Sequence, residues 1–166
     1  MENSINNLSV PEMHKQNTIL WTAFLVGGTL MGTIIFFLTY THPEFYNFDN
    51  FLQSPMLIIA TAITFLNAFM GERVLKKRYE EAKDLKGLKE KFISSRANFI
   101  LKAALHEGPL VICIVFMQIE NNVYFLILAA INWILLYLSK PTIEKFKENY
   151  DLSSSEKQEL TMAGLV

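Results

Sequence analysis

Long apolar stretches constrain this chain more than any other feature of its sequence. Two of them, residues 18–40 and 122–139, carry no charged side chain. A third, residues 55–73, has charges only at its last two positions, and a fourth, residues 98–119, contains one lysine and one glutamate. A bilayer core of about 30 Å is crossed by roughly 20 helical residues. The sequence therefore predicts four membrane-spanning helices.

The overall composition agrees with this prediction. Hydrophobic residues make up 51% of the 166 residues and charged residues 19%, and the mean hydropathy is +0.24. A chain with this much apolar surface is not of the disordered class. Its single cysteine, Cys113, excludes a disulfide framework and a cysteine-based zinc site. The alternative to a membrane protein is a soluble bundle whose helices are buried on all sides.

The basic residues are sorted along the chain in the pattern of a membrane protein. All 15 lysines and arginines lie at Lys15, within residues 73–102 or within residues 140–157. The connections at residues 41–54 and 120–121 contain none. Four crossings would place every basic segment on one side of the bilayer, which the positive-inside rule identifies as the cytoplasm. We therefore expect an integral protein of the plasma or inner membrane with both termini in the cytoplasm.

The predicted fold is all-α: an integral membrane four-helix bundle over residues 18–139, with a cytoplasmic helical hairpin extension at residues 73–97. A polar segment, residues 1–17, precedes the bundle, and a cytoplasmic helical tail, residues 140–166, follows it. The hairpin is predicted to turn near Gly87. In the tail, Pro141 favours a first short helix. The pair Ser153 and Glu156 forms a capping-box pattern that predicts the start of a second one.

The hairpin is strongly basic. Residues 73–97 contain nine basic and four acidic side chains, a net charge of +5. Each basic residue near an anionic bilayer contributes on the order of 1 kcal/mol. The hairpin is thus predicted to contact anionic lipid or a partner protein through Lys76, Lys77, Arg78, Lys83, Lys86, Lys89 and Lys91. The alternative is an ordinary solvated connection. Nothing in the chain resembles a base-reading element, so nucleic acid is not an expected partner.

Glu107 is the residue that points most directly to a function. Counted at 1.5 Å per residue from Asn98, it lies about 13 Å into the membrane, where a charge costs roughly 2.5–3.5 kcal/mol. It therefore either carries a proton near neutral pH or faces polar partners. Counted in the same way from the cytoplasmic side, Thr64 and Asn132 both lie about 12 Å deep, and Asn67 lies nearer the inner surface. The candidates for a proton or ion site are Glu107, His106, Asn132, Thr64 and Asn67. Two alternatives stay open: a carboxyl that only joins helices by hydrogen bonding, and a late helix start that leaves Glu107 near the surface.

Two further features of the predicted helices bear on their packing. Gly28 and Gly32 have the GxxxG spacing that permits close helix approach, either inside the bundle or between copies of the chain. Pro109 cannot donate its N–H within the helix, so it leaves the carbonyl of Leu105 free and favours a kink beside Glu107.

Residues 94–115 place a basic residue before an apolar helix with a central acid. Through Arg96, Lys102, Ala103, Ala104, Leu105, Glu107 and Gly108, this stretch resembles the second helix of the ATP synthase proteolipid, the c subunit, and residues 56–118 are similar to its hairpin. The resemblance implies that Glu107 corresponds to the acid that carries the transported proton or sodium ion. The chain departs from the family in lacking its glycine repeat in residues 55–71 and in placing Pro109 close after the acid.

Functionally, the sequence contains no nucleophile–base pattern, nucleotide-binding loop or metal signature, so we expect neither an enzyme nor a bound cofactor or metal. The leading prediction is a non-enzymatic membrane subunit or scaffold, surrounded by lipid and either self-associating or bound in a larger complex. The alternative is an oligomeric proton or cation pathway in which Glu107 is the carrier.

Overall fold

The computed structural model describes residues 8–42 and 54–165, and all the regular structure in these residues is helical. The predicted all-α class is confirmed. The helices are α2 (Val10–Thr39), α3 (Pro55–Lys83), α4 (Leu88–Glu120), α5 (Tyr124–Leu138), α6 (Ile143–Tyr150) and α7 (Ser154–Met162). The predicted segments at residues 1–7 and 43–53 lie outside the described residues.

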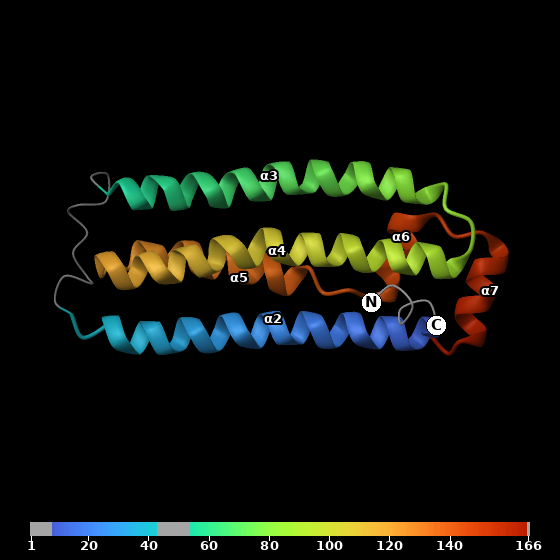
Figure 1. The fold of residues 1–166 in the computed structure, drawn as a ribbon, viewed down its shortest axis with the longest axis horizontal. Coiled ribbons are helices and arrows are strands. Elements are labelled where there is room, and N and C mark those ends of the chain that lie inside the picture. The colour runs from blue at the N-terminus through green and yellow to red at the C-terminus, as the bar shows by residue number, and fades with distance from the viewer. Residues whose placement is uncertain (1–7, 43–53, 166) are drawn as a thin grey trace.

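The central helix of the molecule is α4. It packs against α2, α3 and α5, and α2 and α3 lie on either side of it (Figure 1). The two short helices α6 and α7 gather at one end of the long helices, the end where α2 begins and where α3 turns into α4 (Figure 1). The fold is therefore a bundle of long helices, and α6 and α7 pack together at one end of it.

Three of the helices, α2, α3 and α4, are long and apolar enough to cross a membrane. Helix α5 has 15 residues, about 22 Å at 1.5 Å per residue, and completes a fourth candidate span only together with α6, from which it is bent by 79°. The outer faces of the long helices expose large apolar side chains, such as Phe37 at 62% and Phe65 at 65%. Such faces are unlike those of a soluble bundle and are typical of helices that cross a membrane.

Helix boundaries follow local sequence signals, and some differ from the prediction. Helix α2 begins at Val10, eight residues before the predicted span at residue 18, because Ser9 and Glu12 form a capping box there. The Ser9 N–H donates to the Glu12 carboxylate over 2.7 Å. The predicted turn at Gly87 is confirmed: this glycine precedes α4 with φ +99°, a conformation that side chains disfavour.

The predicted fourth apolar span, residues 122–139, is shortened at both ends. Asn122 accepts a hydrogen bond from the Tyr124 N–H over 3.0 Å, and Ser139 is the C-terminal cap of α5. In the tail, α6 begins at Ile143 behind Thr142, so Pro141 precedes the helix rather than occupying its first turn. By contrast, α4 runs without a break through Pro109.

The buried apolar residues form two separate cores. The bundle core lies between α2, α3, α4 and α5 and includes Ala60, Cys113 and Phe125. The head core joins the start of α2, the α3–α4 hairpin, α6 and α7; its buried residues are Met13, Ala82, Leu88, Phe92, Ile143, Phe146, Tyr150, Leu152 and Leu160. We call the part of the molecule around this second core the head.

Candidate functional site

Two of the predicted intramembrane site residues meet inside the bundle. Asn132 of α5 donates a hydrogen bond from Nδ2 to the Thr64 hydroxyl of α3 over 3.0 Å, and a second one to the Leu128 carbonyl over 2.9 Å. Both polar side chains are buried, at 1% and 3% exposure. The predicted depth match between Thr64 and Asn132 is therefore correct, and the pair fastens α3 to α5.

The remaining predicted residues do not join this pair. In the described part of the chain, no hydrogen bond or ion pair reaches the side chain of Glu107, which is half-buried on α4. His106 faces inward and is buried, with its Nδ1 unpaired among the described residues. Asn67 is half-buried on α3. Glu107 instead lies beside Ala104 and Gly108, whose positions on α4 are exposed.

The glycines of α2 and α3 allow both helices to approach α4 closely. A Cβ atom at Gly28 would lie 2.7 Å from Cδ2 of Leu110, and one at Gly32 would lie 3.5 Å from the Ile114 side chain. The predicted packing role of both glycines is thus seen inside the bundle. Gly71 has the same role on α3: a Cβ atom there would lie 2.9 Å from Cδ1 of Leu105. This glycine was not predicted because it belongs to no repeat.

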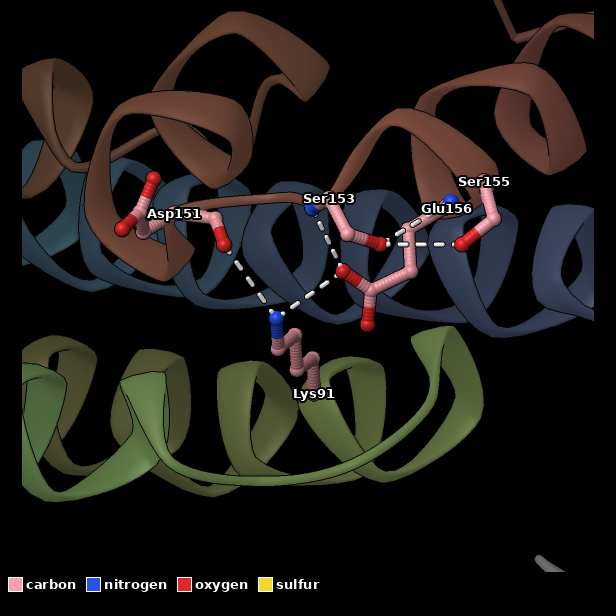
Figure 2. A network of polar contacts seen from close by, with 5 residues as sticks. All are labelled: Lys91, Asp151, Ser153, Ser155 and Glu156. Carbon is pink, nitrogen blue, oxygen red and sulfur yellow. Dashed lines mark hydrogen bonds and ion pairs between the residues drawn. The ribbon is translucent and has the colours of Figure 1, made fainter.

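Lys91 was predicted to contact lipid or a partner at the surface, and this prediction is wrong. Its side chain is buried at the start of α4 and makes an ion pair with Glu156 of α7 over 3.0 Å (Figure 2). Its Nζ also donates to the Asp151 carbonyl over 3.3 Å. The tail folds back over the hairpin and withdraws this charge from the solvent.

Glu156 makes several contacts in this network. Its carboxylate accepts hydrogen bonds from Lys91 and from the Ser153 N–H, the latter over 2.8 Å (Figure 2). The predicted capping box of Ser153 and Glu156 is confirmed. Burial by itself would raise the pKa of Glu156, but these hydrogen bonds and the Lys91 charge outweigh it and hold the pKa below its ordinary value.

The other basic residues of the hairpin are exposed or lie at its edges. Lys83 pairs with Glu80 over 2.9 Å, and Lys77 lies 3.9 Å from Glu81. Lys76, Arg78, Lys86 and Lys89 are exposed. Ion pairs at the surface contribute little, so they leave the charge of the hairpin available.

A cleft of about 640 Å³ lies where the bundle meets the head. Its walls come from α3, α4, the start of α2, the segment between α5 and α6, and α6 itself. We call it the interface cleft. Aromatic side chains contribute apolar wall, including Phe69, Phe99 and Phe146. The Asn132–Thr64 pair is buried and offers no such space, so the interface cleft is the main candidate binding site in the described residues.

The interface cleft is lined by six basic residues, Arg73, Lys76, Lys83, Lys102, Lys140 and Lys145, and by three acidic ones, Glu72, Glu80 and Glu148. Lys102 pairs with Glu72 over 3.0 Å across α3 and α4. Lys145 donates to the Leu138 carbonyl over 2.6 Å and so caps the end of α5. Burial, and then the charge of Lys102, hold the pKa of Lys145 below its ordinary value.

Apart from Lys145, three of these cations make no ion pair with an acidic side chain in the described residues. The Arg73 guanidinium lies 4.2 Å from the centre of the Phe69 ring, and the Lys140 ammonium lies 5.4 Å from that of Trp21. Lys76 is exposed on α3, one turn from Arg73. Sequence reasoning missed Arg73 and Lys140 as site residues, since only the fold brings residues 73 and 140 to one cleft.

Comparison with known proteins places this chain in no family: no family model matches it, nor does any curated protein or solved structure. The resemblance to the ATP synthase proteolipid therefore stays a prediction.

Proposed function

We propose that this protein is a non-enzymatic membrane subunit or scaffold. In this proposal α2–α5 form a four-helix bundle in the bilayer and hold the head at the cytoplasmic surface. The observation that carries it is the continuity of α2, α3 and α4, each of which contributes to both the bundle core and the head core. Because these helices run without interruption through both cores, the head is held in a fixed position relative to the bundle. A scaffold needs such a fixed position to present its head to a partner.

The fourth crossing in this proposal is α5. It is short, but Asn132 and Trp21 tie it into the bundle: the Trp21 indole N–H donates to the Leu136 carbonyl over 3.1 Å. A short apolar helix is accommodated by local thinning of the bilayer at a modest cost. The orientation follows from the sorting of the basic residues, all of which would lie at the head end of the bundle.

The scaffold role is tested by what stays bound to the protein in mild detergent. Leu160 of α7 is fully buried in the head core, whereas Met162 is 75% exposed. We expect native mass spectrometry of the unmodified protein to show an assembly heavier than the 19.1 kDa chain. Leu160→Asp should detach α7 and release the bound subunits, while Met162→Asp should retain them. A single 19.1 kDa chain in all three preparations would contradict the proposal.

A second function, an oligomeric proton or cation pathway, is supported by the position of Glu107. Its carboxyl has no polar partner in the described residues and lies beside the exposed small residues Ala104 and Gly108. Small residues permit close contact between membrane helices, so a second copy packed on this face would meet the carboxyl. An intramembrane acid is by default a candidate carrier.

The pathway is tested by carbodiimide labelling and by proton flux into vesicles that contain the purified protein. We expect Glu107→Gln to abolish both. Glu120→Gln is the control, because Glu120 lies at the end of α4, where the Ser54 hydroxyl hydrogen-bonds to it. Unmodified protein that conducts no protons or cations would exclude the pathway and leave the scaffold role standing.

A further inference from the structure

The interface cleft combines the features of a phospholipid headgroup site. We propose that it binds one anionic phospholipid of the cytoplasmic leaflet, with Arg73, Lys76 and Lys140 contacting the phosphate. The inference goes beyond the scaffold role and relies only on the bundle lying in a membrane. Of the basic hairpin residues that the sequence predicted to contact lipid, only Lys76 is among the three that contact the phosphate in this proposal.

Charge complementarity is the first argument for an anionic occupant. Two of the acids in the cleft, Glu72 and Glu80, pair with Lys102 and Lys83. In the described residues this leaves four cations without an ion pair, Arg73, Lys76, Lys140 and Lys145, against the single remaining acid, Glu148. Lys145 already donates to the Leu138 carbonyl, so the other three are the candidates for the phosphate. The cleft therefore has an excess of positive charge, which a phosphate diester would neutralise.

The geometry of Arg73 favours one directly bound phosphate over loosely associated anions. Its guanidinium lies over the Phe69 ring, a cation–π contact that restrains the side chain while its N–H groups remain able to donate. Phosphate accepts two parallel hydrogen bonds from such a fork. An ordered guanidinium loses less conformational freedom on binding than a flexible one.

The level of the cleft identifies the occupant as a lipid. Arg73 is the first basic residue after the apolar part of α3, and Lys140 lies two residues after the end of α5. Trp21, beside Lys140, is a residue type that marks the headgroup level of a bilayer. Phe69 and Ala68 line the cleft on the bundle side, where the apolar part of a lipid would begin.

One wall of the cleft also contains an unpaired polar group. Asn17 of α2 is 2% exposed, and its side-chain oxygen has no hydrogen-bond partner among the described residues. Buried polar atoms are normally paired. A hydroxyl donor next to the lipid phosphate would supply the missing partner after a small side-chain adjustment, so a glycerol headgroup is favoured over one without a donor.

The test uses the full-length protein in detergent, titrated with phosphatidylglycerol or phosphatidylcholine and observed by native mass spectrometry. We expect one tightly bound phosphatidylglycerol and no comparable phosphatidylcholine. The variant Arg73→Gln/Lys76→Gln/Lys140→Gln should weaken phosphatidylglycerol binding on the order of 100-fold, about fivefold for each charge. A matched control, Lys77→Gln/Arg78→Gln/Lys86→Gln, removes the same charges elsewhere on the hairpin and should bind like the unmodified protein.

Trp21 provides a second readout. In a Trp133→Phe background it is the only tryptophan, and its emission should change as Lys140 turns from the ring to the phosphate, saturating at one phosphatidylglycerol per chain. The proposal is overturned if phosphatidylcholine binds equally well or if the cleft variant keeps its lipid. Displacement of the lipid by excess inorganic phosphate would equally overturn it and indicate a soluble phosphate compound as the occupant. Unmodified protein that binds the lipid but shows no assembly heavier than its 19.1 kDa chain would refute the scaffold role alone.

Discussion

Lys91 stands in a run of basic residues that, by sequence alone, belongs to a solvated surface. In the folded chain it is buried beneath α7 and paired with Glu156. The two residues are 65 positions apart, so no local sequence pattern predicts their contact. The capping box that orients Glu156 was predictable, because both of its members lie within one turn of helix.

Removing the Glu156 charge should destabilise the head. Glu156→Gln leaves the Lys91 ammonium buried without its counter-charge, at a cost of about 3 kcal/mol in the free energy of unfolding. The matched control is Glu80→Gln, whose pair with Lys83 is exposed and which should change stability by less than about 1 kcal/mol. Thermal unfolding in detergent, followed by circular dichroism, measures both. Equal effects would show that burial of the Lys91–Glu156 pair has no consequence.

The same pair predicts a loss of head stability in acid. The pKa of Glu156 lies below its ordinary 4.5 in the folded protein, so the folded state binds this proton less tightly than the unfolded state does. The resulting stability is complete above about pH 4.5 and is lost as the pH falls through the lower, folded pKa. Limited proteolysis of the tail across this range should show cleavage increasing in acid, and the increase should be smaller in Glu156→Gln.

For the intramembrane residues, the sequence predicted how deep each side chain lies along its helix. It did not predict toward which neighbouring helix each side chain points. Counting residues from the membrane edge correctly brought Thr64 and Asn132 to one level. It also placed Glu107 there, yet that side chain leaves α4 on a different side from the pair. Direction depends on which face of α4 the other three helices occupy, and the spacing within a single helix does not fix this.

At the scale of elements, α2 and α4 are held together at a glycine. The position of the helices was predictable from uncharged runs, whereas their ends depended on single polar residues such as Ser9 before α2 and Asn122 before α5. The GxxxG spacing indicated a packing face on α2 without naming its partner. The structure supplies it: Gly28 opposes Leu110 of α4.

Substitution of neighbouring glycines should separate packing from helix propensity. Gly28→Ala would place its methyl group 2.7 Å from Cδ2 of Leu110, a buried side chain with little room to move. We expect a loss of about 1–3 kcal/mol from this overpacking. Gly27→Ala meets nothing within 4 Å and should be neutral or stabilising by up to about 1 kcal/mol. Unfolding in mixed detergent micelles distinguishes the two, and a stabilised Gly28→Ala would contradict the close approach.

At the scale of the whole molecule, the interface cleft could not be predicted from the sequence. The three cations proposed to contact phosphate come from residues 73–76 on α3 and from Lys140 after α5. In the sequence, each of these positions is an ordinary charged boundary of an apolar segment. They share one cleft because α6 turns by 79° from α5 and lies against the hairpin. The bend follows from the short segment around Pro141, whose effect on direction no periodicity encodes.

The same arrangement predicts which ends of the molecule are on the same side of the membrane. Lys86, at the hairpin turn, and Gln158, on α7, both belong to the head end, whereas His42 follows the opposite end of α2 (Figure 1). In a Cys113→Ala background, His42→Cys should react with a membrane-impermeant maleimide on intact cells, and Lys86→Cys and Gln158→Cys only after permeabilisation. Leu30, 59% exposed in the middle of α2, should resist labelling as cysteine under both conditions, because lipid covers it. A reactive Leu30→Cys would mean that water surrounds the bundle, and labelling of Lys86→Cys on intact cells would reverse the proposed orientation.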